Sequence, residues 1–164
     1  MVDISKIQGL NLSVFCSRDF YCMWPQTGHR LLCNDPRLDY VLLPPDSSPE
    51  SLGTHVRLAL NQSTAIPWEE FQVIFNSGDV QKAVSRWEDE LSKKFGYKTR
   101  KALFKNMKNC LVKESDEGIE FTPTRQDRLD GWQGLGAEEK IHISSESSNE
   151  AVGAALLKTL GRCE

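Results

Sequence analysis

The sequence predicts an α+β fold in which two pseudo-symmetric, strand-rich halves share one antiparallel sheet and each half ends in a capped helix. The first observation is a repeat, because residues 47–61 align without a gap on residues 147–161 at a constant offset of 100. The second is a short β-rich run ahead of each copy, as expected of a strand that leads into a helix. The third is a pair of helical patterns at 66–96 that only the first half carries, so we expect two extra helices inserted between the halves.

The chain of 164 residues is long enough to bury one self-sufficient core. We therefore expect a single domain over residues 1–164, divided into a first half (10–61), the inserted helices (66–96) and a second half (100–161). Its composition, 39% hydrophobic and 26% charged, is typical of a soluble globular protein. The sequence has no long apolar run, and charged residues interrupt the apolar residues of the N-terminal segment. We therefore expect neither a membrane span nor a secretory signal, and we expect a cytoplasmic location.

The first half is predicted to supply a strand, a hairpin and a further strand. Apolar, aromatic-rich runs at 12–16 and 20–24 predict two strands. Residues 25–28 read Pro-Gln-Thr-Gly, which predicts a turn into another strand at 29–33. A strand at 38–43 then leads to the first repeated helix, and the two prolines that follow it end the strand.

Each copy of the repeat has the pattern of a capped, amphipathic helix. Ser47 and Ser147 each precede a glutamate by three residues, the capping-box spacing that satisfies free amides of a first helical turn. Apolar residues then recur at every fourth position, which places them on one face. Gly53 and Gly153 lie beside that face, where a missing side chain would let each helix approach the sheet closely. A chance resemblance between two amphipathic helices is the alternative explanation of the repeat.

The insertion is predicted to form two amphipathic helices. The first begins at Pro67 and places Trp68, Phe71 and Phe75 on one face, and residues 76–78 break it. The apolar stripe of the second, longer helix consists of Val80, Val84, Trp87, Leu91 and Phe95. Aromatic residues on such stripes are usually core residues, so we expect both stripes to be buried.

The second half repeats the plan of the first. Strands are predicted around 102–107, 110–114 and 118–122, and again at 140–143 before the second repeated helix. Residues 123–137 form a polar stretch with three glycines and a single tryptophan. A loop of this length is unusual in a compact domain and is often functional.

The sequence has no pattern typical of a metal site, a cofactor site or a catalytic centre. The five cysteines include no C-x-x-C pair and no histidine stands at ligand spacing from them, so we expect reduced thiols and neither zinc nor disulfides. The nucleophile-elbow, Walker, zinc-protease and dinucleotide motifs are all missing. The carboxylate pairs are adjacent in sequence, which does not favour acid–base catalysis across a cleft. We therefore expect no catalytic residues, no cofactor, no metal and no enzymatic activity.

Charge is distributed unevenly along the chain. The formal net charge of −3 arises from 20 Lys and Arg against 23 Asp and Glu. Residues 91–113 contain eight of the cations and no acid, so the rest of the chain has 12 cations, 23 acids and a net charge of −11.

Two binding hypotheses follow from this division. In the basic segment, the cations are interspersed with the aromatic residues Phe95, Tyr97 and Phe104. This pattern is typical of a surface that binds the phosphates of single-stranded nucleic acid and stacks on its bases. The cations assigned to that surface are Lys98, Arg100, Lys101, Lys105 and Lys108. An ordinary solvated lysine face is the simpler explanation of the same pattern. The acidic remainder instead suits a basic protein partner such as a nuclease, and the residues alone leave both hypotheses open.

Five segments carry a resemblance to a known family. They are residues 101–107, 118–123, 131–132, 141–143 and 148–155. Together they are similar to the immunity proteins of bacterial contact-dependent growth inhibition (CDI) systems, a family of about this length. The resemblance implies a cytoplasmic protein without enzymatic activity that binds a toxin domain delivered by a neighbouring cell, of the nuclease or RNase class, and blocks its active site. Some members resemble the Whirly single-stranded-DNA-binding fold, whose two strand-rich halves each end in a helix.

The resemblance supplies no fixed contact residues, so the toxin-binding surface is predicted from local features. The candidates are Arg125, Asp127, Arg128, Asp130 and Trp132 in the polar loop, with Asp116 and Glu117 at the tip of the neighbouring hairpin. Long irregular loops often carry recognition, and Trp and Arg are favoured anchors at interfaces. For Trp132 a second interpretation is a core side chain that ties the loop down.

Overall fold

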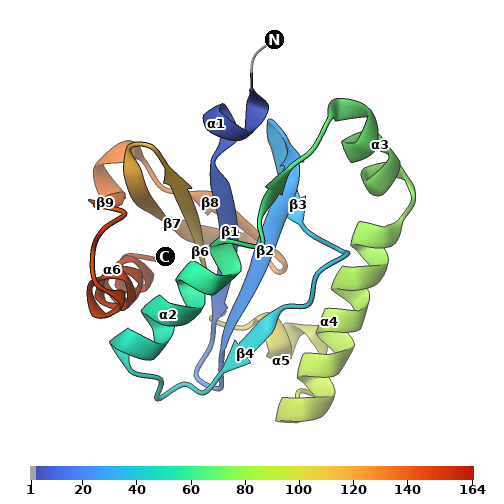
Figure 1. Ribbon diagram of the computed structural model, residues 1–164. Helices are drawn as coiled ribbons and strands as arrows, with labels where there is room; N and C mark the ends of the chain where they lie inside the picture. The colour runs from blue at the N-terminus through green and yellow to red at the C-terminus, as the bar shows by residue number, and fades with distance from the viewer. Residues whose placement is uncertain (1–2) are drawn as a thin grey trace.

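A computed structural model describes residues 3–164, and within that range the strands form one nine-stranded sheet (Figure 1). The main path through the sheet is β3-β2-β1-β6-β7-β8, while β4 and β5 also pair with β2 and β9 pairs with β7. The strands are β1 (Leu10–Cys16), β2 (Tyr21–His29), β3 (Leu31–Asn34), β4 (Val41–Leu43), β5 (Thr64–Ala65), β6 (Lys108–Ser115), β7 (Gly118–Arg128), β8 (Gly131–Gly134) and β9 (Ile141–Ile143). The helices are α1 (Ile4–Gln8), α2 (Pro49–Leu60), α3 (Trp68–Asn76), α4 (Asp79–Phe95), α5 (Arg100–Phe104) and α6 (Asn149–Gly161), with a 3₁₀ turn η1 (Ala137–Glu139).

The two halves have the same order of elements, which confirms the predicted α+β fold. Four strands and a helix (β1 to β4, then α2) are followed, after the insertion, by four strands and a helix (β6 to β9, then α6). In each half the fourth strand pairs with the start of the second, as Tyr21 with Leu43 and as Ile119 with Ile143. β1 and β6 pair antiparallel at the centre of the sheet and join the halves. The repeat therefore extends well beyond the aligned helices.

Equivalent prolines mark the same position in both halves. Pro25 and Pro123 lie where the second strand changes its edge partner, from β4 to β3 in one half and from β9 to β8 in the other. Each proline carbonyl accepts a backbone hydrogen bond at 2.9 Å, from Asp35 and from Leu135. The predicted turn at 25–28 was wrong, because a proline is tolerated where the regular ladder is interrupted and β2 continues through it to His29.

The repeated helices pack against each other at their glycines. A methyl group added at Gly53 would overlap the carbonyl oxygen of Asn149, and one added at Gly153 would overlap that of Pro49. The prediction that these glycines let each helix approach the sheet was therefore wrong, because they let each helix approach the other helix. The capping residues are also one place later than predicted: the hydroxyls of Ser48 and Ser148 accept from backbone amides three residues on, each at 3.1 Å.

The insertion contains α3 and α4 as predicted, and it is flanked by the two-residue strand β5 and the short helix α5. The strand predicted around 102–107 was wrong: Thr99 caps α5 by accepting from the amide of Ala102 at 3.0 Å, and the Arg-Lys-Ala-Leu sequence favours a helix. The long loop predicted at 123–137 was also wrong, because β7 runs on to Arg128 and pairs with β8.

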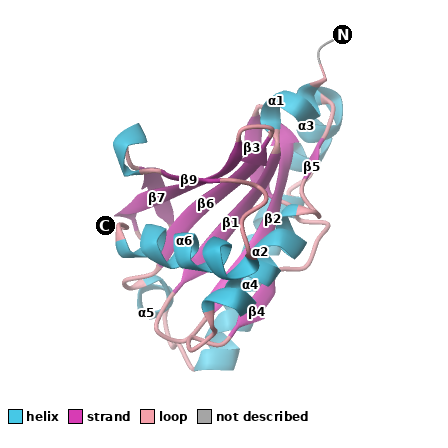
Figure 2. Ribbon diagram, turned by 60° about the vertical axis from the view of Figure 1, so that its left-hand side comes forward, coloured by secondary structure: helices cyan, strands magenta, loops and turns pink. Residues whose placement is uncertain are grey.

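The sheet has a separate core on each face. α2 and α6 lie side by side across one face (Figure 2) and bury Leu52, Val56, Val152 and Leu156 against it. The other face packs on α4 and α5, whose buried residues include Ala83, Trp87, Leu91, Leu103 and Phe104. Both faces are thus covered by helices, and function is to be sought at the sheet edges and in the insertion.

We predict that Gly53→Ala lowers the free energy of unfolding by about 3 kcal/mol, because the added methyl group meets the backbone of α6 and the helices must separate. Urea unfolding followed by circular dichroism measures the change. Gly161→Ala is the matched control, since this exposed helical glycine has no atom within 4 Å of the added methyl group, and it should stabilise by about 0.5–1 kcal/mol. Equal stabilities for the two variants would contradict this packing.

Candidate functional site

The predicted toxin-binding loop is a β-hairpin. Arg125 pairs with Gln133 and Arg128 with Gly131, and the register shifts between Gln126 and Arg128. This hairpin occupies the same place in the second half as the β2–β3 hairpin in the first, at the offset of 100 residues between β3 and β8. That correspondence was the signal in the sequence that would have identified the hairpin.

Trp132 ties this hairpin to the core on the α4 side of the sheet. Its half-buried ring packs against Phe15 and Phe104, with centroids 5.4 and 6.1 Å away, and its indole N–H donates to the carbonyl of Met107 at 3.0 Å. Of the two interpretations that the sequence left open, the contacts place Trp132 as a core side chain.

The charged candidates of the hairpin differ in their surroundings. Asp130 pairs with Arg100 at 2.9 Å, and Arg125 lies 3.9 Å from Glu164. These pairs are solvent-exposed, so each contributes little to stability. The remaining hairpin candidates, Asp127 and Arg128, line a shallow groove together with Lys101, Lys105 and Asn106 of the basic segment.

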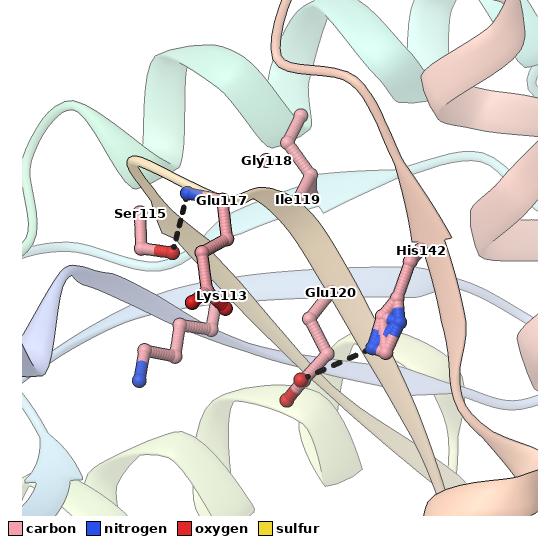
Figure 3. Close-up of a pocket in the computed structure, with 7 residues that line it drawn as sticks. All are labelled: Lys113, Ser115, Glu117, Gly118, Ile119, Glu120 and His142. Carbon is pink, nitrogen blue, oxygen red and sulfur yellow. Dashed lines mark hydrogen bonds and ion pairs between the residues drawn. The ribbon is translucent and has the colours of Figure 1, made fainter.

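Asp116 and Glu117 lie far from the other candidates. They form the turn at the opposite end of β7, whose 11 residues span roughly 35 Å. Figure 3 shows Glu117 beside Lys113 and Glu120, near a His142 imidazole that is 3.3 Å from the Glu120 carboxylate. The prediction that these acids neighbour the polar loop was wrong, because that loop is the far part of a long strand.

The basic segment keeps its exposed lysines but not the aromatic faces predicted for stacking bases. Phe104 is buried, and Phe95 and Tyr97 are half-buried against the α4–α5 core, where Phe95 stacks on Phe20. The Tyr97 hydroxyl donates to Asp19. Arg100 is paired with Glu88 at 2.8 Å as well as with Asp130. Of the proposed nucleic-acid surface, only a set of lysines remains.

Sequence reasoning missed an apolar groove between α3 and β3. We define the α3–β3 groove by its main lining residues, Leu31, Leu32, Trp68, Phe71, Gln72 and Phe75, which enclose about 360 Å³. Phe71 is buried, but Trp68 is 42% and Phe75 57% exposed, so the prediction of a buried stripe was wrong for those two residues. One signal was present: Leu31 and Leu32 are consecutive in a strand, so they point to opposite faces.

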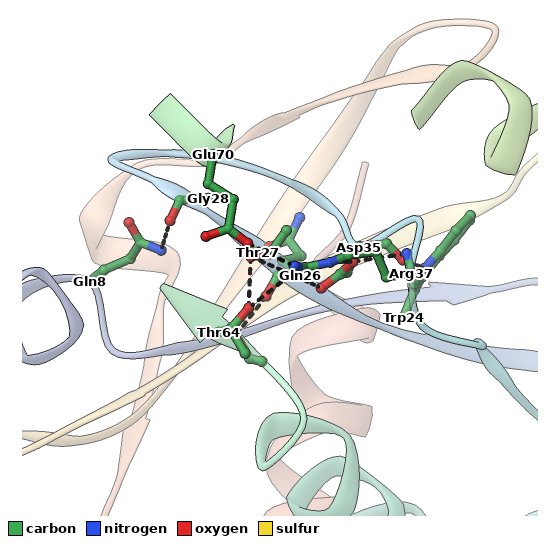
Figure 4. A network of polar contacts seen from close by, with 10 residues as sticks. Gln8, Trp24, Gln26, Thr27, Gly28, Asp35, Arg37, Thr64 and Glu70 are labelled. Atoms are coloured by element: carbon green, nitrogen blue, oxygen red, sulfur yellow. Dashed lines mark hydrogen bonds and ion pairs between the residues drawn. The ribbon is translucent and has the colours of Figure 1, made fainter. Parts of the chain in front are cut away.

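A polar network fixes α3 beside the sheet (Figure 4). Asp35 is almost fully buried and accepts two hydrogen bonds from the Arg37 guanidinium, at 3.0 and 2.9 Å. The same guanidinium reaches Glu70 of α3 at 3.2 Å. The hydrogen bond to Asp35 raises the pKa of Arg37, which is therefore a permanent cation between the two carboxylates. Arg37 and Glu70 are each nearly half exposed, so this ion pair connects the first turn of α3 to the segment after β3 but contributes little to stability.

Burial keeps two cysteine thiols of the described chain in their protonated form near neutral pH. Burial raises the pKa of the Cys16 thiol to about 11 and that of Cys22 to about 12. Among residues 3–164, no group of three or more His, Cys, Asp or Glu side chains is placed to hold a metal ion. No helix in the same range is long and apolar enough to cross a membrane.

Comparison with known proteins gives a consistent result. A family model described as CDI immunity protein (CdiI) matches residues 10–163. The immunity protein CdiI-YPIII of Yersinia pseudotuberculosis serotype O:3 is 34% identical over 93% of this chain and 94% of its own length. A solved toxin and immunity complex, CdiA-CT/CdiI from Y. pseudotuberculosis, has a chain that matches with a TM-score of 0.86, at 30% identity over 95% of this chain and 98% of its own. A Neisseria meningitidis protein of unknown function matches over the full length of both chains with a TM-score of 0.90 and 27% identity.

We predict that the thiols of Cys16 and Cys22 alkylate slowly with iodoacetamide at pH 8, because raised pKa values leave them protonated. A pKa near 11 in place of 9 reduces the thiolate fraction of Cys16 about 100-fold, and the rate should rise only as the pH approaches that value. Mass spectrometry of each labelled peptide measures the rate, and the urea-unfolded chain is the control. Labelling of the folded chain at the unfolded rate would show that these thiols are accessible and ionised.

Proposed function

Because the chain belongs to the CDI immunity protein family, we propose that it binds the toxin domain of a cognate CdiA protein and neutralises it. The observation that carries the proposal is the extent of the match, since the family model spans both halves and the insertion between them. The related Yersinia structure is a complex of a toxin with its immunity protein. The acidic charge outside the basic segment also suits a protein partner.

We further propose that the toxin is a nuclease, in particular an RNase. A nuclease must present cations to the phosphates of its substrate, so its active-site surface is basic. Outside the basic segment this chain has a net charge of −11, and opposite charges speed the encounter of two proteins. The nucleic-acid alternative is weaker, since the aromatic side chains that it requires are packed in the core.

The cytoplasm is the proposed site of action, because a nuclease meets its substrate there. All five cysteines are free in the structure, which is typical of proteins in a reducing compartment. Neutralisation by covering an active site needs no catalytic group on the inhibitor. A standard interface covers about 800 Å² on each partner, which is a small part of the 9251 Å² surface of this chain.

The β7–β8 hairpin remains a predicted contact surface for the toxin. Its exposed candidates are Arg125, Asp127, Arg128 and Asp130, whereas Trp132 supports the hairpin from the core. Asp116 and Glu117 stand roughly 35 Å away along β7, so a toxin of standard interface size that covers the hairpin reaches them only at its rim.

We predict that cells expressing the co-encoded toxin domain survive when they also make this chain, because an inhibitor bound at nanomolar Kd or tighter leaves almost no free toxin. Colony counts after toxin induction measure protection, and cells that carry an empty vector are the control. The purified toxin domain should also cleave RNA, and an equimolar amount of this chain should stop the cleavage. Equal killing with and without the chain would overturn the proposed function, whereas protection without RNA cleavage would overturn only the choice of an RNase.

A further inference from the structure

We propose that the α3–β3 groove is a docking site for the toxin domain, where it receives an apolar side chain flanked by lysine or arginine. This inference rests on the proposed function and adds a surface to it. The groove lies at the opposite edge of the sheet from the β7–β8 hairpin, since β3 and β8 end the main strand path.

The exposure of the groove is the first argument. Four exposed apolar residues from two separate elements line it: Leu31 is 63% and Leu32 38% exposed, beside the half-exposed Trp68 and Phe75. Single exposed apolar residues are common, but a contiguous cluster rimmed by polar groups is typical of a binding surface. The Trp68 ring also meets the His29 ring, with centroids 6.1 Å apart, and the exposed part of each of the four side chains remains available to a partner.

The rigidity of the groove is the second argument. Trp68 stacks on Phe71 and Phe71 stacks on Phe75, with ring centroids 5.7 Å apart in both pairs. Below them, the buried residues Cys33, Ile66, Phe71 and Ile74 form a small core of their own. A groove built in this way already has its binding shape. Its side chains therefore lose less conformational entropy when a partner binds.

The charge on the α3 side of the groove bears on the partner. Residues 66–81 carry Glu69, Glu70 and Asp79 and contain no lysine or arginine, whereas on the β3 side the exposed Arg30 precedes Leu31. Glu70 is paired with Arg37, whereas Glu69 and Asp79 are exposed and make no ion pair among the described residues. An apolar groove with unpaired acids on its α3 side is complementary to an apolar side chain that has cations beside it, which is what the basic surface of a nuclease offers.

The same charges disfavour the other occupants of such a groove. A nucleic acid would bring phosphates against the carboxylates of α3. A second copy of this chain, docked by two-fold symmetry, would place Glu69 and Asp79 near their own counterparts. The groove also belongs to the insertion, which the second half lacks, so it is not a by-product of the repeated scaffold.

Two substitutions and one control test the proposal with the purified chain and a catalytically inactive form of the co-encoded toxin domain. Phe75→Asp and Leu31→Asp place a charge in the groove, and each should raise the Kd about 100-fold, as expected for interface anchors. Val73→Asp is the matched control, because Val73 is 69% exposed on the same helix but does not line the groove. It should change the Kd less than about threefold. Competition binding measures the Kd values, and circular dichroism verifies that each variant is folded.

The outcomes separate this inference from the proposed function. If the unchanged chain does not bind the toxin domain, the proposed function fails and the inference fails with it. If the unchanged chain binds, and Phe75→Asp and Leu31→Asp bind as tightly as Val73→Asp does, the groove is not a toxin contact although the function stands. A loss of binding in Arg128→Asp alone would place the contact at the β7–β8 hairpin and overturn the inference. Self-association of the unchanged chain that Phe75→Asp abolishes, with toxin binding intact, would assign the groove to a second copy and also overturn it.

Discussion

The close crossing of α2 and α6 is the constraint on which the rest of the structure depends. Each helix presents a glycine to a backbone carbonyl at the start of the other, Gly53 to Asn149 and Gly153 to Pro49, and no larger residue fits at either place. Arg57 strengthens the contact from α2, because its guanidinium donates to Asn149 and to the carbonyl of Ser145, both at 3.0 Å. The crossing fixes the halves relative to each other on one face, and the pairing of β1 with β6 fixes them within the sheet.

This symmetric arrangement separates the scaffold from the surfaces that recognise a partner. Repeated positions serve capping, close packing or strand pairing, and even the change of edge partner at Pro25 recurs at Pro123. The insertion has no counterpart, and it builds both the second core on α4 and the exposed groove beside α3. Because the insertion lies outside the contact between α2 and α6, its surface can change without disturbing the crossing of the two helices.

The fold was predictable where local patterns agree with tertiary packing. The repeated helices and the inserted helices follow from spacing, and the α+β class follows from the order of the elements. Two of the errors share one cause, which is that local signals compete with contacts that the sequence does not display. Gly153 was assigned to the sheet because its partner helix is distant in sequence, and 123–137 was taken for a loop because the pairing of β7 with β8 is not visible in its polar residues.

The candidate site was less predictable than the fold. Trp132 was recognised as notable, but only its contacts with Phe15 and Met107 show that it supports the core. Trp68 and Phe75 follow the same helical spacing as buried residues, and their exposure depends on α3 lying at the edge of the molecule, where it covers β3 only in part. The spacing of apolar residues along a helix does not distinguish a stripe that packs on the sheet of the same chain from a stripe that stays exposed.

Hydrogen exchange of this chain with and without the inactive toxin domain tests the central claim most directly. The account predicts that the toxin slows exchange in residues 29–34 and 68–78, while the buried amides of α2 and α6 keep their rates. Slower exchange confined to α2 and α6, with residues 29–34 and 68–78 unchanged, would show that recognition lies on the repeated scaffold and would contradict it.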